Sequence, residues 1–298
     1  MSHLNIAQKE AAETLEGPLL ILAGAGAGKT KTLVERISNL VKKGVDPENI
    51  LAITFTNKAA LEMRERVEKT LFGNPATGRI EKPPFVSTFH ALGVHILREQ
   101  AYTLGLPRHF AIFDRGDSKN LIKQALKDEG LDPKEFEPGK ILGIISKEKG
   151  NAVSASTYEV TMEGDYIGSI VSRIWRRYET ALRQEKALDF DDLLVETAKL
   201  LERADIGNLY RSRWRYIHVD EYQDTNIIQY KIAKLLTGPS MDICVVGDID
   251  QNIYSWRGAK LKNILDFERD YPGAKVIILE ENYRSTQTIL EAANAVIA

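Results

Sequence analysis

The stretch PLLILAGAGAGKTKTLVERISNLVKKG, from Pro18 to Gly44, does most to limit the folds open to this chain. An apolar run leads into a glycine-rich turn, and Lys29 and Thr30 then begin a helical pattern. Glycines let backbone N–H groups close around phosphate oxygens, and a helix N-terminus adds partial positive charge. We therefore expect a nucleotide-binding loop, with Lys29 reaching the β- and γ-phosphates and the Thr30 hydroxyl binding Mg²⁺.

Short apolar runs alternate with helical patterns in the first and last thirds of the chain. The runs LAITFT, YIHVDE, DICVVGD and KVIILEE are nearly continuous, as in strands that are covered on both faces of a parallel sheet. From about residue 91 to 212 the patterns are almost all helical. The sequence therefore predicts an α/β fold, with a mostly parallel sheet, helices on both faces and an inserted all-helical subdomain.

Composition excludes several classes of protein. The chain is 43% apolar and 28% charged, and it contains no apolar run long enough for a membrane helix. The polar N-terminus is unlike a secretory signal, and one cysteine rules out a disulfide framework, so we expect a cytoplasmic protein. A net charge of −2 means that any contact with DNA would come from a local patch.

An acidic pair supplies the partner that a phosphate loop requires. Asp220 and Glu221 directly follow the apolar run YIHV. We expect Asp220 to bind Mg²⁺, directly or through water, and Glu221 to orient and deprotonate the attacking water.

Three aromatic clusters are suited to holding single-stranded nucleic acid. A grip that does not depend on sequence combines aromatic faces for base stacking with polar or cationic groups for phosphates. The first cluster surrounds Phe55, the second surrounds Phe89, and the third contains Tyr254 and Trp256 beside Arg257. Each cluster follows an apolar run, so all three can lie at strand ends. Phe89 itself is expected to be a core residue. The residues of these clusters that suit such a grip are Phe55, Thr56, Asn57, Thr88, His90, Tyr254, Trp256 and Arg257, and the family resemblance described next implies that they bind DNA.

With these motifs in view, the chain resembles the superfamily 1 DNA helicases of the UvrD/Rep/PcrA group. The resemblance is carried, in the family's order and spacing, by LNIAQ, AGAGAGKT, TFTNKAA, TFHAL, DEYQD, GDIDQNIYSWRGA and NYRS. It implies a RecA-like P-loop NTPase domain formed by residues 1–90 and 213–280. It also implies a helical subdomain at 91–212 and the truncated start of a second motor domain at 281–298.

The resemblance also implies residue roles. Gln8 would read the adenine edge, Tyr283 would stack on the adenine ring and Arg284 would touch the γ-phosphate. Gln251 would sense the γ-phosphate and couple it to DNA, so that the catalytic set is Glu221, Lys29, Gln251 and Arg284. The loop residues implied to bind nucleotide are Ala25, Gly26, Ala27, Gly28, Lys29, Thr30 and Lys31. Lys31 stands where relatives often carry Arg. A Lys keeps the positive charge but cannot form the bidentate hydrogen bonds of Arg, so we expect a lower nucleotide affinity here.

The function implied is that of an ATP-dependent DNA helicase of repair or replication restart, moving 3′ to 5′, with ATP and Mg²⁺ as cofactors. Its partners would be single-stranded DNA and junctions of single and double strands, and the fragment alone would be nearly inactive. Two alternatives stay open. One is the helicase portion of a RecB- or AddA-like helicase–nuclease; the other is a nucleotide-dependent DNA-binding module without motor activity.

Overall fold

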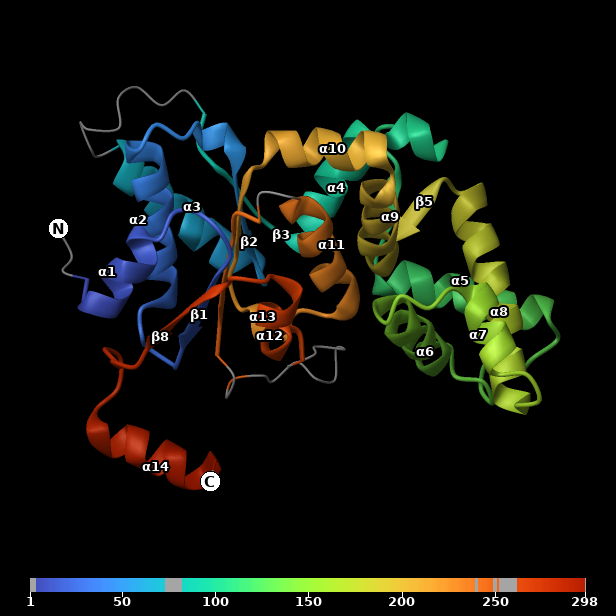
Figure 1. Cartoon of the computed structure of the whole chain (residues 1–298). Helices are drawn as coiled ribbons and strands as arrows, with labels where there is room; N and C mark the ends of the chain where they lie inside the picture. Colours follow the sequence, from blue (N-terminus) through green and yellow to red (C-terminus); the bar gives the residue numbers. More distant parts are fainter. Residues whose placement is uncertain (1–3, 73–81, 239–240, 249–250, 252–261, 298) are drawn as a thin grey trace. The chain divides into compact units, whose positions relative to one another are not determined.

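The computed structural model describes residues 4–72, 82–238, 241–248, 251 and 262–297 (Figure 1). Contacts divide the chain into two compact units. Unit 1 contains Met1–Thr88, Asp205–Thr225 and Ala233–Ala298, and unit 2 contains Phe89–Ala204 and Asn226–Ile232. None of the described helices is both long enough and apolar enough to cross a membrane.

Unit 1 is built on a six-stranded sheet. Its strands are β1 (Leu19–Ala23), β2 (Ile50–Thr54), β3 (Phe85–Thr88), β6 (Tyr216–Val219), β7 (Ile243–Gly247) and β8 (Lys275–Leu279). They lie in the order β3-β2-β6-β7-β1-β8, and each of these pairings is parallel. The predicted parallel sheet is confirmed. Because parallel strands end at one edge of a sheet, the motifs that follow them are brought to that edge.

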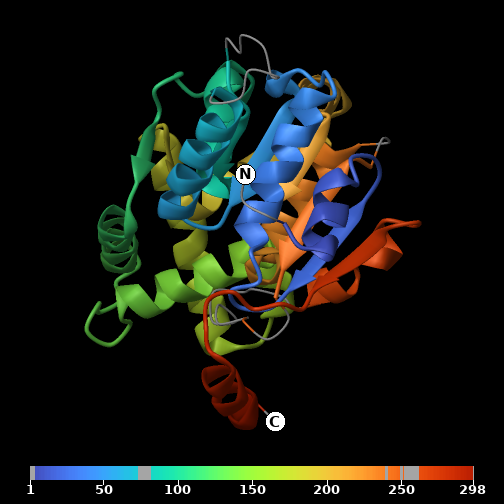
Figure 2. The same ribbon diagram turned by 90° about the vertical axis from the view of Figure 1, so that its left-hand side faces the viewer.

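Apart from β8 at the edge of the sheet, where Lys275 and Ile278 are exposed, the strands are buried along nearly their whole length, which explains their nearly continuous apolar runs. On one face of the sheet, Leu19 and Ile21 of β1 pack in a single core cluster with helix residues that include Leu33, Ile37 and Met63. Figure 2 looks onto this face, which α1, α2 and α3 cover. The helices of unit 1 are α1 (Ile6–Glu13), α2 (Lys29–Lys42), α3 (Asn57–Phe72), α10 (Ala204–Arg213), α12 (Lys262–Leu265), α13 (Phe267–Asp270) and α14 (Gln287–Ile297), with short 3₁₀ turns η1 (Pro47–Asn49) and η4 (Tyr222–Asp224).

The return from the insertion comes earlier than the predicted residue 213. Helix α10 already belongs to unit 1 apart from its first residue. Tyr210 stacks on Trp214 at 5.5 Å between ring centroids, and Trp214 lies 5.3 Å from Phe85 of β3. Arg211 Nη1 donates to the Leu235 carbonyl at 3.0 Å. The segment RSRWRY is therefore packed against the sheet.

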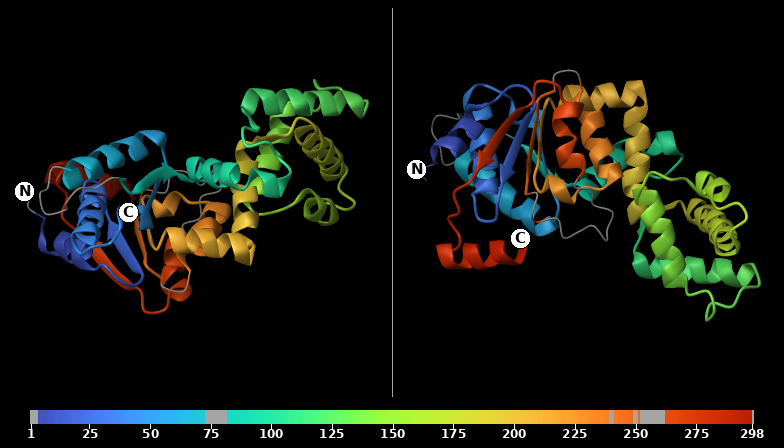
Figure 3. Two further views of the ribbon diagram at one scale, coloured as in Figure 1. Left: turned by 90° about the horizontal axis from the view of Figure 1, so that it is seen from above. Right: turned by 60° about the horizontal axis from the view of Figure 1, so that its bottom comes forward.

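Unit 2 is mainly helical. It contains α4 (Phe89–Glu99), the 3₁₀ turn η3 (Ala101–Leu104), α5 (Arg115–Asp128), α6 (Pro138–Gly150), α7 (Ala155–Thr161), α8 (Tyr166–Gln184), α9 (Phe190–Glu202) and the start of α11 (Ile227–Thr237). Helices α5 to α8 lie side by side (Figure 3) around a core that includes Trp175 and Tyr178. The prediction that this region is all-helical needs correction, because β4 (Ala111–Phe113) and β5 (Ala187–Asp189) form a parallel pair.

The segment LDFDDLL joins the elements of unit 2 through a buried ion cluster. Lys149 Nζ of α6 lies 2.8 Å from Asp189 Oδ2 and 2.6 Å from Asp192 Oδ1. The Tyr178 hydroxyl of α8 donates to Asp189 Oδ2 at 2.8 Å, and Asp189 also caps α9. Through these contacts, the segment serves a structural role by linking α6, α8 and α9.

Candidate functional site

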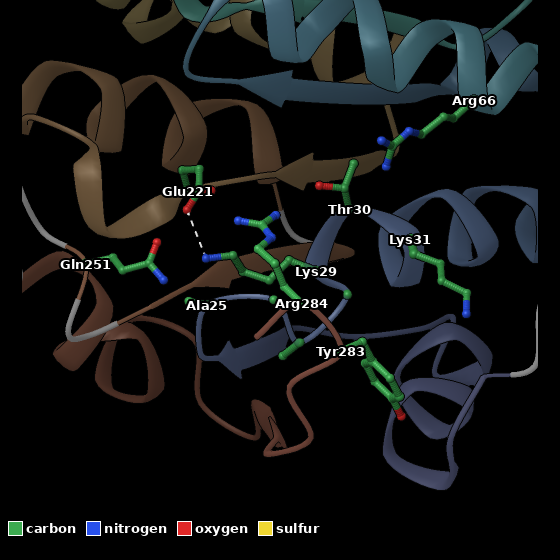
Figure 4. A pocket seen from close by; sticks show the side chains of 12 residues that line it. Ala25, Lys29, Thr30, Lys31, Arg66, Glu221, Gln251, Tyr283 and Arg284 are labelled. Carbon is green, nitrogen blue, oxygen red and sulfur yellow. Dashed lines mark ion pairs between the residues drawn. The ribbon is translucent and has the colours of Figure 1, made fainter. Parts of the chain in front are cut away.

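A cavity of about 240 Å³ lies at the carboxyl edge of the sheet in unit 1 (Figure 4). Segments far apart in the sequence contribute to it: the loop after β1, helix α3, the turn after β6 and the segment after β8. Its lining residues are Ala25, Gly26, Ala27, Gly28, Lys29, Thr30, Lys31, Arg66, Glu221, Gln251, Tyr283 and Arg284. The structure thus brings together most of the residues predicted to bind nucleotide.

The loop between β1 and α2 takes a shape that requires glycine. Gly26 and Gly28 have φ values of +73° and +83°, in the left-handed region. Gly28 is the N-cap of α2 and provides no side-chain hydrogen bond to the first turn. The N-cap residue therefore leaves the backbone N–H groups in the first turn of α2 without a side-chain acceptor. Such a helix N-terminus suits an anionic ligand.

Flanking segments hold three successive carbonyl groups of this loop. Gln8 Nε2 donates to the Ala27 carbonyl at 2.9 Å, and the Tyr283 backbone N–H donates to the Gly26 carbonyl at 3.1 Å. Asn282 Nδ2 donates to the Ala25 carbonyl. Because these carbonyl groups are fixed by the N-terminal segment and by the segment after β8, the loop is braced from two sides.

Lys29 is placed to neutralise a bound anion. Its Nζ lies 3.3 Å from Glu221 Oε2 and 4.0 Å from Asp248 Oδ2, and its side chain is only 11% exposed. Among the described residues this Nζ finds no hydrogen-bond partner, although it is buried. A buried ammonium without a hydrogen-bond acceptor is unfavourable, so a phosphate oxygen would complete its environment.

The predicted magnesium ligands lie together. Burial first, and then the neighbouring Glu221 carboxylate, raise the pKa of Asp220 to about 7, against the lowering effects of Lys29 and of a hydrogen bond with the Thr30 side chain. A carboxylate held next to a hydroxyl at the edge of a phosphate cavity fits Mg²⁺, which binds through one or two protein oxygens together with substrate phosphates and water. Binding of the cation would stabilise the ionised form of Asp220.

Glu221 has a strained backbone. Its φ of +52° places a non-glycine residue in the left-handed region, two residues after the end of β6. Such strain costs about 1–3 kcal/mol and persists only where the surroundings hold it. Gln251 lies on the same side of the cavity as Glu221 (Figure 4), and its Nε2 donates to Asp248 Oδ2 at 2.6 Å.

Three more cations line the cavity, namely Lys31, Arg66 and Arg284. With Lys29 they outnumber the one acidic lining residue, Glu221, and this balance favours a polyanion such as a triphosphate. Arg66 was not predicted, since it lies within the charged pattern ALEMRERVEKT of α3, where nothing separates it from a solvated helix face.

The two residues predicted to bind adenine are placed differently. Tyr283 lines the cavity and is 60% exposed; its hydroxyl donates to Glu281 and accepts from Asn5 Nδ2 at 2.9 Å. Gln8 is 1% exposed, and its Oε1 accepts from the Asn5 N–H at 3.0 Å. Reading an adenine edge would require Gln8 to exchange these bonds, so that role stays a prediction.

The predicted DNA contacts are described only in part. Phe55 is half-buried after β2, and Thr56 and Asn57 are exposed, with Asn57 as the first residue of α3. Thr88 ends β3, and its hydroxyl lies 3.5 Å from Asn57 Oδ1. Three predicted residues lie outside the described part of the chain: Tyr254, Trp256 and Arg257.

In unit 2, His90 lies 6.0 Å from Phe190 between ring centroids, with the two rings in a T-shaped arrangement. Phe190 is 51% exposed, which makes it a candidate for base stacking that sequence reasoning missed. Phe89 is buried, as expected.

Comparison with known proteins is consistent with this site. Residues 4–272 match the model of the UvrD/REP helicase N-terminal domain. The chain is 50% identical over 299 residues to the ATP-dependent DNA helicase PcrA of Staphylococcus aureus and 49% identical to that of Bacillus subtilis. The PcrA protein of Staphylococcus epidermidis is 48% identical. All of this chain is covered, and it spans 40% of the length of each relative. These names give no support to the helicase–nuclease alternative.

Proposed function

The chain belongs to the family of UvrD/REP helicase N-terminal domains, and from that premise we propose that it binds and hydrolyses ATP and holds single-stranded DNA as part of an ATP-dependent DNA helicase. Unwinding, 3′ to 5′ movement, action at junctions and a role in repair or replication restart are proposals for the whole protein, as is a cytoplasmic location. The relatives' printed name, ATP-dependent DNA helicase PcrA, supports ATP use and a DNA substrate.

One observation carries the proposal: the buried Lys29 ammonium lies 3.3 Å from Glu221 in a cavity formed by a glycine-rich loop. A triphosphate in this cavity would draw its negative charge toward Lys29, Arg284 and the N-terminus of α2. Mg²⁺, bound through Thr30 and Asp220, would supply further charge neutralisation on the phosphates.

Glu221 would act on water. In the structure its carboxylate pairs with Lys29, so a γ-phosphate that takes Lys29 as its partner leaves Glu221 to accept a proton from the attacking water. Arg284 would stabilise charge on the γ-phosphate, and Gln251, held by Asp248, would contact the same group. Phe55 and the residues around it would hold unpaired bases by stacking, which contributes about 1–3 kcal/mol per base.

The proposal is tested by ATP hydrolysis in the full-length protein that carries these residues, with and without a single-stranded oligonucleotide. We expect hydrolysis to be stimulated by DNA, and Glu221→Gln to lower kcat by about 10²–10⁴-fold, the usual contribution of a general base, while MgATP still binds. If wild-type protein hydrolyses no ATP in the presence of DNA and Mg²⁺, the proposal is wrong. We expect the 298-residue chain alone to bind nucleotide and to turn it over very slowly.

A further inference from the structure

Gln223 carries a buried side-chain amide and lies two residues after Glu221. It belongs to η4 and is 1% exposed. Both ends of the amide are bonded. Its Nε2 donates to Glu221 Oε2 at 2.8 Å and lies 3.4 Å from Asp224 Oδ2, while its Oε1 accepts from the Asp248 N–H at 3.0 Å. Since only Oε1 can accept from an N–H group, the amide has one orientation that satisfies both partners.

The donor end controls which oxygen of Glu221 is available. Glu221 Oε2 receives the Gln223 hydrogen bond and also lies 3.3 Å from Lys29 Nζ. With Oε2 held in this way, Oε1 is the oxygen left to take a proton from water. The hydrogen bond therefore fixes the rotation of a carboxylate whose backbone is already in a strained conformation.

The acceptor end reaches the neighbouring strand β7. Asp248 follows β7, and its Oδ2 accepts from Gln251 Nε2 at 2.6 Å. An unbroken series of hydrogen bonds therefore runs from Glu221 through Gln223 and Asp248 to Gln251. This series links the proposed water-activating carboxylate to the proposed γ-phosphate sensor.

Gly247 makes this approach possible. A Cβ atom on Gly247 would lie 2.9 Å from Gln223 Oε1 and 2.5 Å from Ile264 Cδ1. The backbone after β7 is thus close to the amide because no side chain stands between them, which is an observation independent of the hydrogen bonds.

We propose that Gln223 is a positioning residue that holds Glu221 and Asp248, and through Asp248 also Gln251, in one arrangement, so that the carboxylate is aligned for attack only when Gln251 is in place. The inference rests on the proposed function. The chain continues from Gln251 toward Tyr254, Trp256 and Arg257, the predicted DNA contacts outside the described residues. The same link would carry the effect of bound DNA to Glu221.

Two substitutions separate positioning from simple structural support. Gln223→Met keeps the length of the side chain and removes both hydrogen bonds. Gln223→Glu keeps an acceptor for the Asp248 N–H but replaces the donor with a carboxylate that repels Glu221. Gln229→Met is the matched control, because Gln229 is 6% exposed and its Oε1 accepts from the Asn226 N–H at 3.0 Å, at the start of α11 and outside the cavity lining.

The experiment measures kcat and KM for ATP, with and without oligo-dT, in the full-length protein, together with MgATP affinity and Tm. For both Gln223 variants we expect kcat to fall about 10–100-fold, part of what a general base contributes, with KM within about twofold and with weaker stimulation by DNA. The Gln229 variant should keep wild-type kcat.

Each outcome decides between the explanations. If either Gln223→Met or Gln223→Glu keeps the wild-type kcat and DNA stimulation, the donor to Glu221 is unnecessary and the inference is overturned while the proposed function stands. If both variants lose Tm and MgATP affinity together, the amide serves folding and the inference is again overturned. If wild-type protein hydrolyses no ATP, the proposed function itself has failed.

Discussion

Gly28→Ala is the substitution whose consequences the structure defines most closely. Gly28 has a φ of +83°, and a Cβ atom there would lie 2.6 Å from Gln8 Nε2, which now donates to the Ala27 carbonyl at 2.9 Å. The contacted atom is the end of a flexible side chain, so Gln8 can move away, but only by giving up that hydrogen bond. The substitution therefore strains the backbone and releases one brace of the loop.

The expected magnitude follows from these two effects. A left-handed conformation costs an L-residue about 1–2 kcal/mol, and the buried hydrogen bond contributes about 1 kcal/mol. The loss of about 2–3 kcal/mol corresponds to a fall in Tm of about 4–12 °C for a domain of this size. Gly24 is the matched control, because a Cβ atom there would meet nothing within 4 Å and its φ lies outside the left-handed region. Gly24→Ala should change stability by less than about 0.5 kcal/mol.

The assay is thermal unfolding of the 298-residue chain, followed by circular dichroism, for wild type and both variants. Equal melting temperatures for Gly28→Ala and Gly24→Ala would refute the reasoning, because they would mean that neither the strain nor the Gln8 brace contributes to stability.

Three further outcomes are expected. Lys149→Met should lower the free energy of unfolding by about 3–5 kcal/mol in urea titrations, because it leaves buried carboxylates without their cation. Burial raises the pKa of Asp192 to about 7, with Lys149 opposing the shift, so the folded state favours the protonated form. The loss of unfolding free energy caused by Lys149→Met should therefore become smaller as pH falls from about 8 to about 5. A loss that stays constant over this range would contradict the reasoning. Thr30→Val should weaken binding of MgATP but not of metal-free ATP in calorimetric titrations, and equal loss in both would argue against a magnesium ligand. Asn282→Ala removes the brace on the Ala25 carbonyl and should weaken binding of a fluorescent ATP analogue about fivefold, the equivalent of about 1 kcal/mol, whereas unchanged affinity would show that the brace is dispensable.

The sheet could be predicted from the sequence because its strands are short and apolar, and because all of them except the edge strand β8 are mostly buried. The run ICVV and the similar apolar runs are each predicted as a buried parallel strand. Because the carboxyl ends of parallel strands meet at one edge of the sheet, the loop residues and the acidic pair are brought together there. The strands β4 and β5 could not be predicted in the same way. Each has three residues, and their pairing depends on the packing of unit 2 rather than on any local pattern.

Polar residues were harder to predict than strands. A glutamine at position 8 could either read a base or brace a loop, and the sequence does not distinguish the two roles. Only the structure shows its hydrogen bonds to Asn5 and Ala27. Arg66 resembles any exposed helical cation in sequence, yet it lines the cavity. Gln223 lies within the motif DEYQD, but its partner Asp248 is contributed by a different strand, so that contact depends on the order of strands in the sheet.

The most direct test of the account is a calorimetric titration of the 298-residue chain with MgATP, repeated with Lys29→Ala. The account predicts saturable binding at one site, weakened by about 10–150-fold in the variant, because the ammonium contributes a charge-assisted hydrogen bond of about 1.5–3 kcal/mol to the phosphates. Wild-type chain that binds no MgATP, or a Lys29→Ala variant that binds it equally well, would contradict the claim that this cavity holds a triphosphate.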